Sequence, residues 1–190
     1  MPAANSACVI LVSAFSPPSG KCEEGLRELE KRGYTVRRGK GYSAIDQGRN
    51  QMTSEALHDG FAETMWIDSE IGFQAEAVER LRSHGLPITC GLYPQPGERK
   101  IACHLLPDTE GIVFGKAGGL MEIKYAAAGF LHVRREAYEL IRERVPFIEN
   151  DEYFLPHIQA VEELVRSGSL AQVALEAASA GAPVPEPAKP

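Results

Sequence analysis

Short apolar runs alternate with amphipathic stretches along the first half of the chain, and this alternation constrains the fold more than any other feature. Cys8–Ser13 is a continuous apolar, β-branched run, which is typical of a strand buried on both faces. Similar runs recur at Tyr34–Arg37, at Thr64–Ile67 and at Pro87–Tyr93. Because an amphipathic stretch separates each run from the next, the order β-α-β-α-β-α-β predicts a mostly parallel sheet with helices on both faces.

Three helices are predicted between these strands. The first ends at Gly33, since glycine is the residue that most readily ends a helix, and the second spans Ile45–His58. The third spans Phe73–Ser83 and is followed by a His-Gly stop.

The pattern changes after about residue 100. Three short apolar segments are separated by Pro, Asp and Gly turns and predict antiparallel hairpins, at Lys100–Leu106, Gly111–Phe114 and Leu120–Ile123. A last strand at Ala128–Val133 then leads into an amphipathic helix at Arg134–Arg144. We therefore expect a three-layer α/β/α domain over residues 1–167. Residues 168–190 are rich in Ala and Pro and are expected to form a disordered tail.

Composition excludes several classes of protein. The net charge of -6 argues against a nucleic-acid partner, because such domains usually carry a basic surface. The four cysteines form no CxxC pair, so the sequence predicts neither a disulfide framework nor a zinc site. The N-terminus lacks the basic start of a signal peptide, and no apolar run approaches the ~20 residues of a membrane span. We expect a soluble, cytoplasmic protein without a membrane span.

The usual glycine-rich phosphate loops are missing. No GxGxxG follows the first strand, and no Gly-x-Ser-x-Gly elbow occurs. Ser19–Cys22 imitates the end of a P-loop, but Phe15 stands where that motif needs its first glycine. Cys22 also lacks the hydroxyl that would hold magnesium, so a P-loop is not predicted.

Two carboxylates follow the third strand, in the stretch TMWIDSEIGF. In an extended chain residues i and i+2 point the same way, so Asp68 and Glu70 would face one site beyond the strand. Like charges placed together favour a cation, and Mg²⁺ or Mn²⁺ takes one or two carboxylates and completes its shell with phosphate oxygens. The alternative is a strand end with solvated acids, in which Asp68 or Ser69 caps the next helix.

Four segments in this order resemble the GT-A fold of the nucleotide-diphospho-sugar transferase superfamily, in particular the family-2-like glycosyltransferases. Asp68-Ser69-Glu70 is similar to the DxD metal motif of that family, in DxE form. The other three segments are Arg49-Asn50 in the second helix, Thr89-Cys90-Gly91-Leu92-Tyr93-Pro94, and Ala127 to Arg135. The resemblance covers about residues 7–145.

The resemblance implies a metal-dependent enzyme that transfers a sugar from a nucleotide-diphospho-sugar to an acceptor hydroxyl. It places Asp68 and Glu70 on a divalent metal, Mn or Mg. The residues that it places near the donor are Ser13, Phe15, Asp46, Arg49, Asn50 and Asp68. The catalytic base would come from the acidic stretch after the last helix, as Asp151 or Glu152.

Several further residues allow two interpretations. A third metal ligand could come from one of three histidines, His104, His132 or His157, although a packed or surface role is the more common one for such residues. Trp66 could stack on a base or belong to the core. Three cations could steer an anionic donor or form a solvated strand end, namely Arg37, Arg38 and Lys40.

Two functions remain open from the sequence. One is the glycosyltransferase, and the other is a truncated GT-A-like domain that binds a nucleotide-sugar or acts as a scaffold without turnover. Nucleotidylyl transfer ranks last, because Phe15–Pro18 lacks the glycine-rich basic loop that this reaction normally uses.

Overall fold

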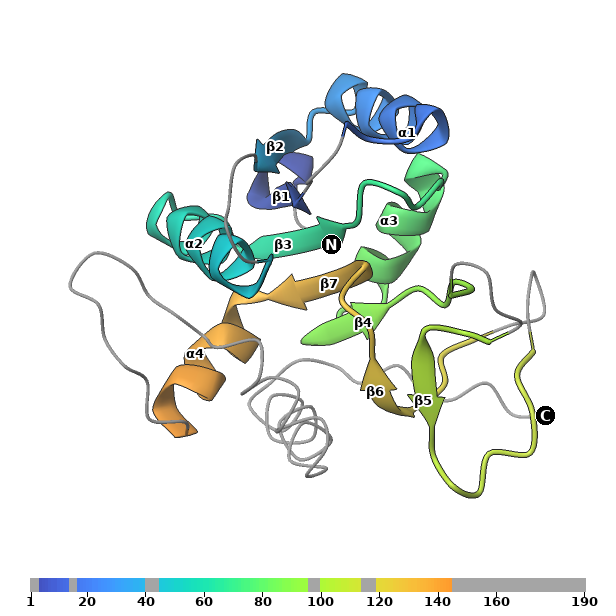
Figure 1. Ribbon diagram of the computed structural model, residues 1–190. Helices are drawn as coiled ribbons and strands as arrows, with labels where there is room; N and C mark the ends of the chain where they lie inside the picture. The colour runs from blue at the N-terminus through green and yellow to red at the C-terminus, as the bar shows by residue number, and fades with distance from the viewer. Residues whose placement is uncertain (1–3, 14–16, 40–44, 96–99, 114–118, 145–190) are drawn as a thin grey trace.

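The computed structural model describes residues 4–13, 17–39, 45–95, 100–113 and 119–144. Within these residues strands and helices alternate as the sequence predicts (Figure 1). A short 3-10 helix, η1, precedes the first strand at Asn5–Ala7. The strands and helices are β1 (Cys8–Ser13), α1 (Gly20–Lys31), β2 (Thr35–Gly39), α2 (Ile45–His58), β3 (Glu63–Ile67), α3 (Ala75–Ser83), β4 (Ile88–Cys90), β5 (Cys103–Leu105), β6 (Ile123–Ala126), β7 (Phe130–Arg134) and α4 (Arg135–Arg144).

Five strands form the central sheet in the order β2-β1-β3-β7-β4. β1 pairs in parallel with both β2 and β3, whereas β7 lies antiparallel between β3 and β4. β4 therefore runs in the same direction as β1, β2 and β3, and the sheet is mostly parallel. β5 and β6 form a separate antiparallel pair, so the expected α/β class and a C-terminal antiparallel hairpin are both confirmed.

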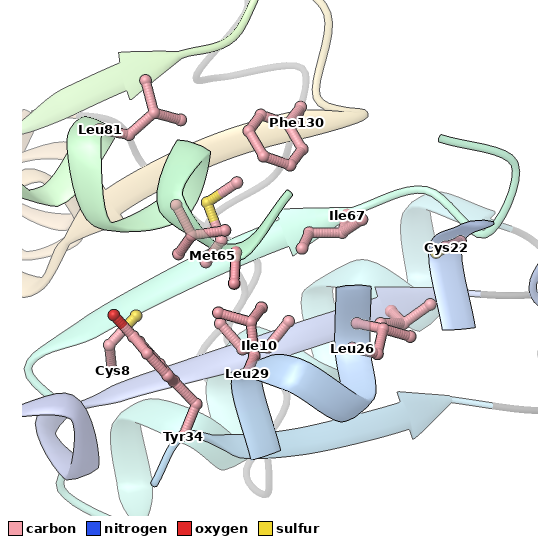
Figure 2. Close-up of a cluster of buried hydrophobic side chains, with 13 residues drawn as sticks. Cys8, Ile10, Cys22, Leu26, Leu29, Tyr34, Met65, Ile67, Leu81 and Phe130 are labelled. Carbon is pink, nitrogen blue, oxygen red and sulfur yellow. The ribbon is translucent and has the colours of Figure 1, made fainter. Parts of the chain in front are cut away.

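Helices cover both faces of the sheet, as expected for three layers. α1 and α3 lie on one face, and α2 and α4 lie on the other (Figure 1). Alternate residues of β3 supply both cores: Met65 and Ile67 pack toward α1 and α3, and Trp66 packs toward α2. Figure 2 shows the larger cluster, in which Leu26 and Leu29 of α1 lie against the strands.

Two glycines end helices where the chain must turn back into the sheet. Gly33 and Gly60 have φ angles of 86° and 87°, in the left-handed region that residues with a Cβ rarely adopt. The amide of Gly33 bonds the Glu30 carbonyl, and that of Tyr34 bonds the Leu29 carbonyl at 3.1 Å. This is the Schellman arrangement, and the predicted role of Gly33 is confirmed.

The second half of the chain differs from the prediction in detail. Within Gly111–Phe114 the described residues 111–113 form no strand, and in Leu120–Ile123 a strand begins only at its last residue. The physical reason is exposure: Val113 and Leu120 are 65% and 52% exposed, so apolar character there does not mark a buried strand. None of the described helices is long and apolar enough to cross a membrane.

Candidate functional site

The central strand β3 delivers Asp68 to the carboxyl end of the sheet. All five residues of β3 are buried, and its ladder with β7 continues one step further, because the Asp68 amide donates to the Gly129 carbonyl at 2.8 Å. In open α/β sheets this edge is where ligands bind. Asp68 is therefore fixed in the backbone of the sheet, with its side chain 37% exposed.

The chain turns immediately after Asp68. The Ile71 amide donates to the Asp68 carbonyl at 3.0 Å, and the Ser69 carbonyl accepts from the Ser19 amide at 2.8 Å. The premise of the prediction for Asp68 and Glu70, a chain that stays extended between them, is therefore wrong, because a turn begins at Asp68; the placement of both carboxylates at one site stays a prediction. The capping alternative is also wrong: α3 begins at Ala75, two residues later than predicted, and its N-cap Gln74 makes no side-chain cap bond.

Arg49 of α2 lies directly on Asp68. Its Nη2 donates to Asp68 Oδ1 at 2.5 Å, and its guanidinium lies 5.6 Å from the centre of the Trp66 ring. The Arg49 side chain is only 11% exposed. Trp66 itself is 5% exposed and belongs to the core on the α2 face, so the core interpretation of this tryptophan is confirmed.

Gly129 and Tyr93 complete the surroundings of Asp68. The Gly129 amide donates to the Tyr93 hydroxyl at 3.0 Å. A Cβ added at Gly129 would lie 2.3 Å from the Tyr93 hydroxyl and 2.6 Å from Asp68 Oδ2, so both oxygens converge on the same point. Burial raises the pKa of Tyr93; the Gly129 bond and the Arg49 charge oppose this rise, and the Asp68 charge adds to it. The phenol therefore stays protonated, and its O–H remains available as a donor beside the Asp68 carboxylate.

The other predicted donor residues occupy varied positions. Asn50 follows Arg49 and is buried, and its Oδ1 has no hydrogen-bond partner among the described residues. Glu70 lies exposed on the turn after Asp68. Ser13 ends β1 and Asp46 lies in the first turn of α2, although the side chains of both fall outside the described residues, as do the whole of Phe15, Asp151 and Glu152.

Two of the three candidate histidines, His104 and His132, lie within the part of the chain described, and neither is placed with Asp68 in a group of metal ligands. His132 is fully buried, with Nε2 3.0 Å from Glu63 Oε2 and Nδ1 3.2 Å from Thr89 Oγ1. Both ring nitrogens are thus occupied, which matches the packed interpretation. His104 is exposed on β5 with its ring edge-on to Tyr125, and His157 lies outside the described residues. No group of three or more His, Cys, Asp or Glu residues is placed to hold a metal among the residues searched.

The two described cations of the Arg37–Lys40 cluster are paired with acids. Arg37 contacts Asp59 at 2.5 Å, and Arg38 contacts Glu30 at 2.8 Å. Their charges are largely neutralised, which favours the solvated strand end over steering of a ligand. Lys40 lies outside the described residues.

Arg49 and Asp68 are among the predicted site residues, whereas no role was predicted for Tyr93 or Gly129. Both residues stand in segments that carry the family resemblance, one in the turn after β4 and the other just before β7. The position of a tyrosine and a glycine beside strands, within these segments, was therefore a signal in the sequence that could have identified both as site residues. Their meeting at Asp68 depends on β7 lying between β3 and β4, which local pattern does not reveal.

Comparison with known proteins supports the general class of the fold. The general class is an α/β domain with a mixed, mostly parallel sheet. A solved structure described as "Crystal Structure of A197 from STIV" is similar to it, with a TM-score of 0.54 and 15% sequence identity over 86% of this chain and 78% of that one. At this identity the similarity concerns the fold alone. No protein-family model and no curated protein matches the sequence.

Proposed function

We propose that this protein is a metal-dependent glycosyltransferase of the GT-A type, which transfers a sugar from a nucleotide-diphospho-sugar to an acceptor hydroxyl. One observation carries the proposal: Asp68 stands at the carboxyl end of the central strand, between Arg49 and the Tyr93 hydroxyl. A carboxylate and a guanidinium side by side match the two charges of a cation–diphosphate pair.

A hard divalent cation prefers carboxylate oxygens, and on this proposal Asp68 and Glu70 would supply them. Asp68 Oδ2 lies in the space that the missing Cβ of Gly129 leaves, and Glu70 offers a second, exposed carboxylate two residues on. A bound cation would supply positive charge to the leaving diphosphate. On this proposal Arg49 holds a phosphate oxygen, and Asp151 or Glu152 takes the proton of the acceptor hydroxyl.

The proposal is tested by calorimetric titration with UDP- and GDP-sugars, with and without Mn²⁺. We expect binding that Mn²⁺ strengthens, and we expect Asp68→Ala to weaken it by about tenfold or more, since one charge-assisted contact contributes about 1.5–3 kcal/mol. Asp59→Ala is the matched control, because Asp59 also bonds an arginine at 2.5 Å but lies on the loop after α2. It should bind like the wild type.

The outcomes separate the alternatives. If no nucleotide-sugar binds under either condition, the donor site is wrong. Binding that survives Asp68→Ala unchanged would remove the metal role of this residue. Turnover with a pool of acceptors then distinguishes the enzyme from the nucleotide-sugar binding domain that binds without transfer.

A further inference from the structure

The carboxylate of Asp68, which the proposed function assigns to a metal cation, already forms an ion pair with the guanidinium of Arg49. Arg49 Nη2 lies 2.5 Å from Asp68 Oδ1, and the arginine side chain is largely buried whereas the carboxylate is partly open to water. The stack of the guanidinium on Trp66 holds the arginine over this position. Arg49 therefore acts as an internal counter-ion at the site.

This pairing sets how single ligands interact with the site. A divalent cation on Asp68 Oδ2 would sit close to the Arg49 guanidinium, and the two positive charges repel strongly in a partly buried place. A phosphate on Arg49 would meet the Asp68 carboxylate, with Glu70 as a further negative charge nearby in the chain. The Arg49 charge therefore opposes a cation that binds alone, and the Asp68 charge opposes a phosphate that binds alone.

Both ligands together remove the conflict. Phosphate can take the Arg49 guanidinium from the Asp68 carboxylate, because guanidinium bonds phosphate and carboxylate oxygens with similar geometry. Asp68 is then left with a full negative charge, with its Oδ2 beside Gly129.

We propose that Arg49 couples the two halves of the site, so that a divalent cation and a phosphate-bearing ligand each raise the affinity for the other. The inference rests on the proposed function for the identity of the two ligands. It adds that the ion pair of Arg49 with Asp68 opposes binding of either ligand alone. Linkage makes the effect reciprocal: whatever factor phosphate adds to the cation affinity, the cation adds to the phosphate affinity.

The chain carries its own reporter of this coupling. Trp66 is the only tryptophan, and the Arg49 guanidinium lies over its ring. Tryptophan fluorescence should therefore change when Arg49 exchanges its partner. The probes are Mg²⁺ and inorganic phosphate, which associate only weakly with each other in solution, so free concentrations are easily controlled. We expect each probe to lower the apparent Kd of the other by about tenfold in the wild-type protein.

Arg49→Met removes the charge while an unbranched side chain continues to cover Trp66. In this variant Mg²⁺ alone should bind about tenfold more tightly, phosphate should lose affinity, and the coupling should fall well below the wild-type value, to what direct attraction between Mg²⁺ and phosphate gives. Arg37→Met is the matched control, because Arg37 also bonds an aspartate at 2.5 Å and covers an aromatic ring, that of Phe61, at 5.1 Å. It makes the same change in net charge, and its coupling should equal that of the wild type.

The readouts distinguish this inference from the proposed function. If Mg²⁺ and phosphate bind the wild-type protein independently, the coupling is overturned whether or not the variants fold, while metal-dependent binding of nucleotide-sugars stands. Unchanged Mg²⁺ affinity in a folded Arg49→Met protein, judged by circular dichroism, overturns it as well. If neither probe binds any of the proteins and nucleotide-sugars also fail to bind, both proposals are wrong.

Discussion

At the scale of single residues, Gly129 shows how the site depends on the absence of a side chain. Its missing Cβ leaves room for the Tyr93 hydroxyl and for Asp68 Oδ2, which would lie 2.3 Å and 2.6 Å from that atom. Real Cβ atoms do not approach other atoms so closely. A methyl group at this position must therefore move the tyrosine, the carboxylate or the backbone that joins them.

We expect Gly129→Ala to lower the free energy of unfolding by about 1–3 kcal/mol, as overpacking typically does. Chemical denaturation measures this change. Gly111→Ala is the control, since a Cβ there meets no atom within 4 Å. The cost of Gly129→Ala should shrink in a Tyr93→Phe background, where the closest oxygen is absent. Equal effects of the two glycine substitutions would contradict the packing described for Asp68.

The residues of the site were predictable to different degrees. Asp68 follows an apolar strand and could be chosen from local pattern, whereas Arg49 was predicted only through the resemblance to the GT-A family. Their contact with each other, and with Tyr93 and Gly129, depends on the order of the strands. The geometry of Glu70 could not be derived either, because the i, i+2 rule holds only while the chain stays extended, and a turn begins at Asp68.

At the scale of elements, a buried ion network joins β3, α3 and β7 away from the candidate site. Glu63 Oε2 accepts from Arg82 Nε at 2.6 Å and from His132 Nε2 at 3.0 Å. Arg82 also donates to the Tyr34 hydroxyl at 2.8 Å and to the Asn5 side-chain oxygen at 3.0 Å. Burial raises the pKa of Glu63, but the His132 and Arg82 hydrogen bonds and the Arg82 charge outweigh it and lower this pKa to about 2.

The lowered pKa makes the network a pH-dependent source of stability. Because the ordinary pKa of 4.5 is higher, the contribution of Glu63 is complete above that pH and is lost as the pH falls toward about 2. We expect Glu63→Gln to lower the free energy of unfolding by about 3 kcal/mol at neutral pH, since it leaves the buried Arg82 without its counter-charge. The difference between wild type and variant should disappear in acid, as followed by urea denaturation.

A surface carboxylate provides the control for this prediction. Glu76 also pairs with an arginine, Arg32, but its side chain is 63% exposed. Glu76→Gln should therefore leave the free energy of unfolding nearly unchanged. If the two substitutions cost the same, or if the Glu63→Gln difference persists below about pH 2, the network does not stabilise the fold in the way described.

Most elements were predictable because their patterns are local. The bounds of β1 and α2 agree with the sequence prediction, and α1 ends near Gly33 as expected. The antiparallel placement of β7 was not predictable, because an apolar run in the sequence does not determine the direction of the strand in the sheet or the strands that lie beside it. The strand expected at Gly111–Phe114 failed over its described residues for a related reason: a short apolar run does not reveal whether anything covers it.

At the scale of the whole molecule, the described residues fall into two unequal parts. The central sheet carries hydrophobic clusters on both faces, whereas none of the cluster residues comes from β5 or β6. Large apolar side chains near that hairpin are exposed, namely Leu106, Val113, Leu120 and Met121. The hairpin therefore buries little apolar surface against the rest of the fold. The prediction of one domain over residues 1–167 extends beyond the described residues and stays a prediction.

This division predicts how the amides exchange with solvent. Amides of β1 and β3 lie in strands with fully buried residues and should exchange only through global unfolding, with one common free energy that falls steeply with urea. Amides of β5 and β6 should exchange through local opening, with a lower free energy that hardly responds to urea, because opening the hairpin exposes little apolar surface. Native-state hydrogen exchange followed by NMR at low urea concentrations measures both groups in one sample. If the hairpin amides shared the free energy and the urea dependence of β3, the two sheets would unfold as one unit, and burial within hydrophobic clusters would not be what sets cooperativity in this fold.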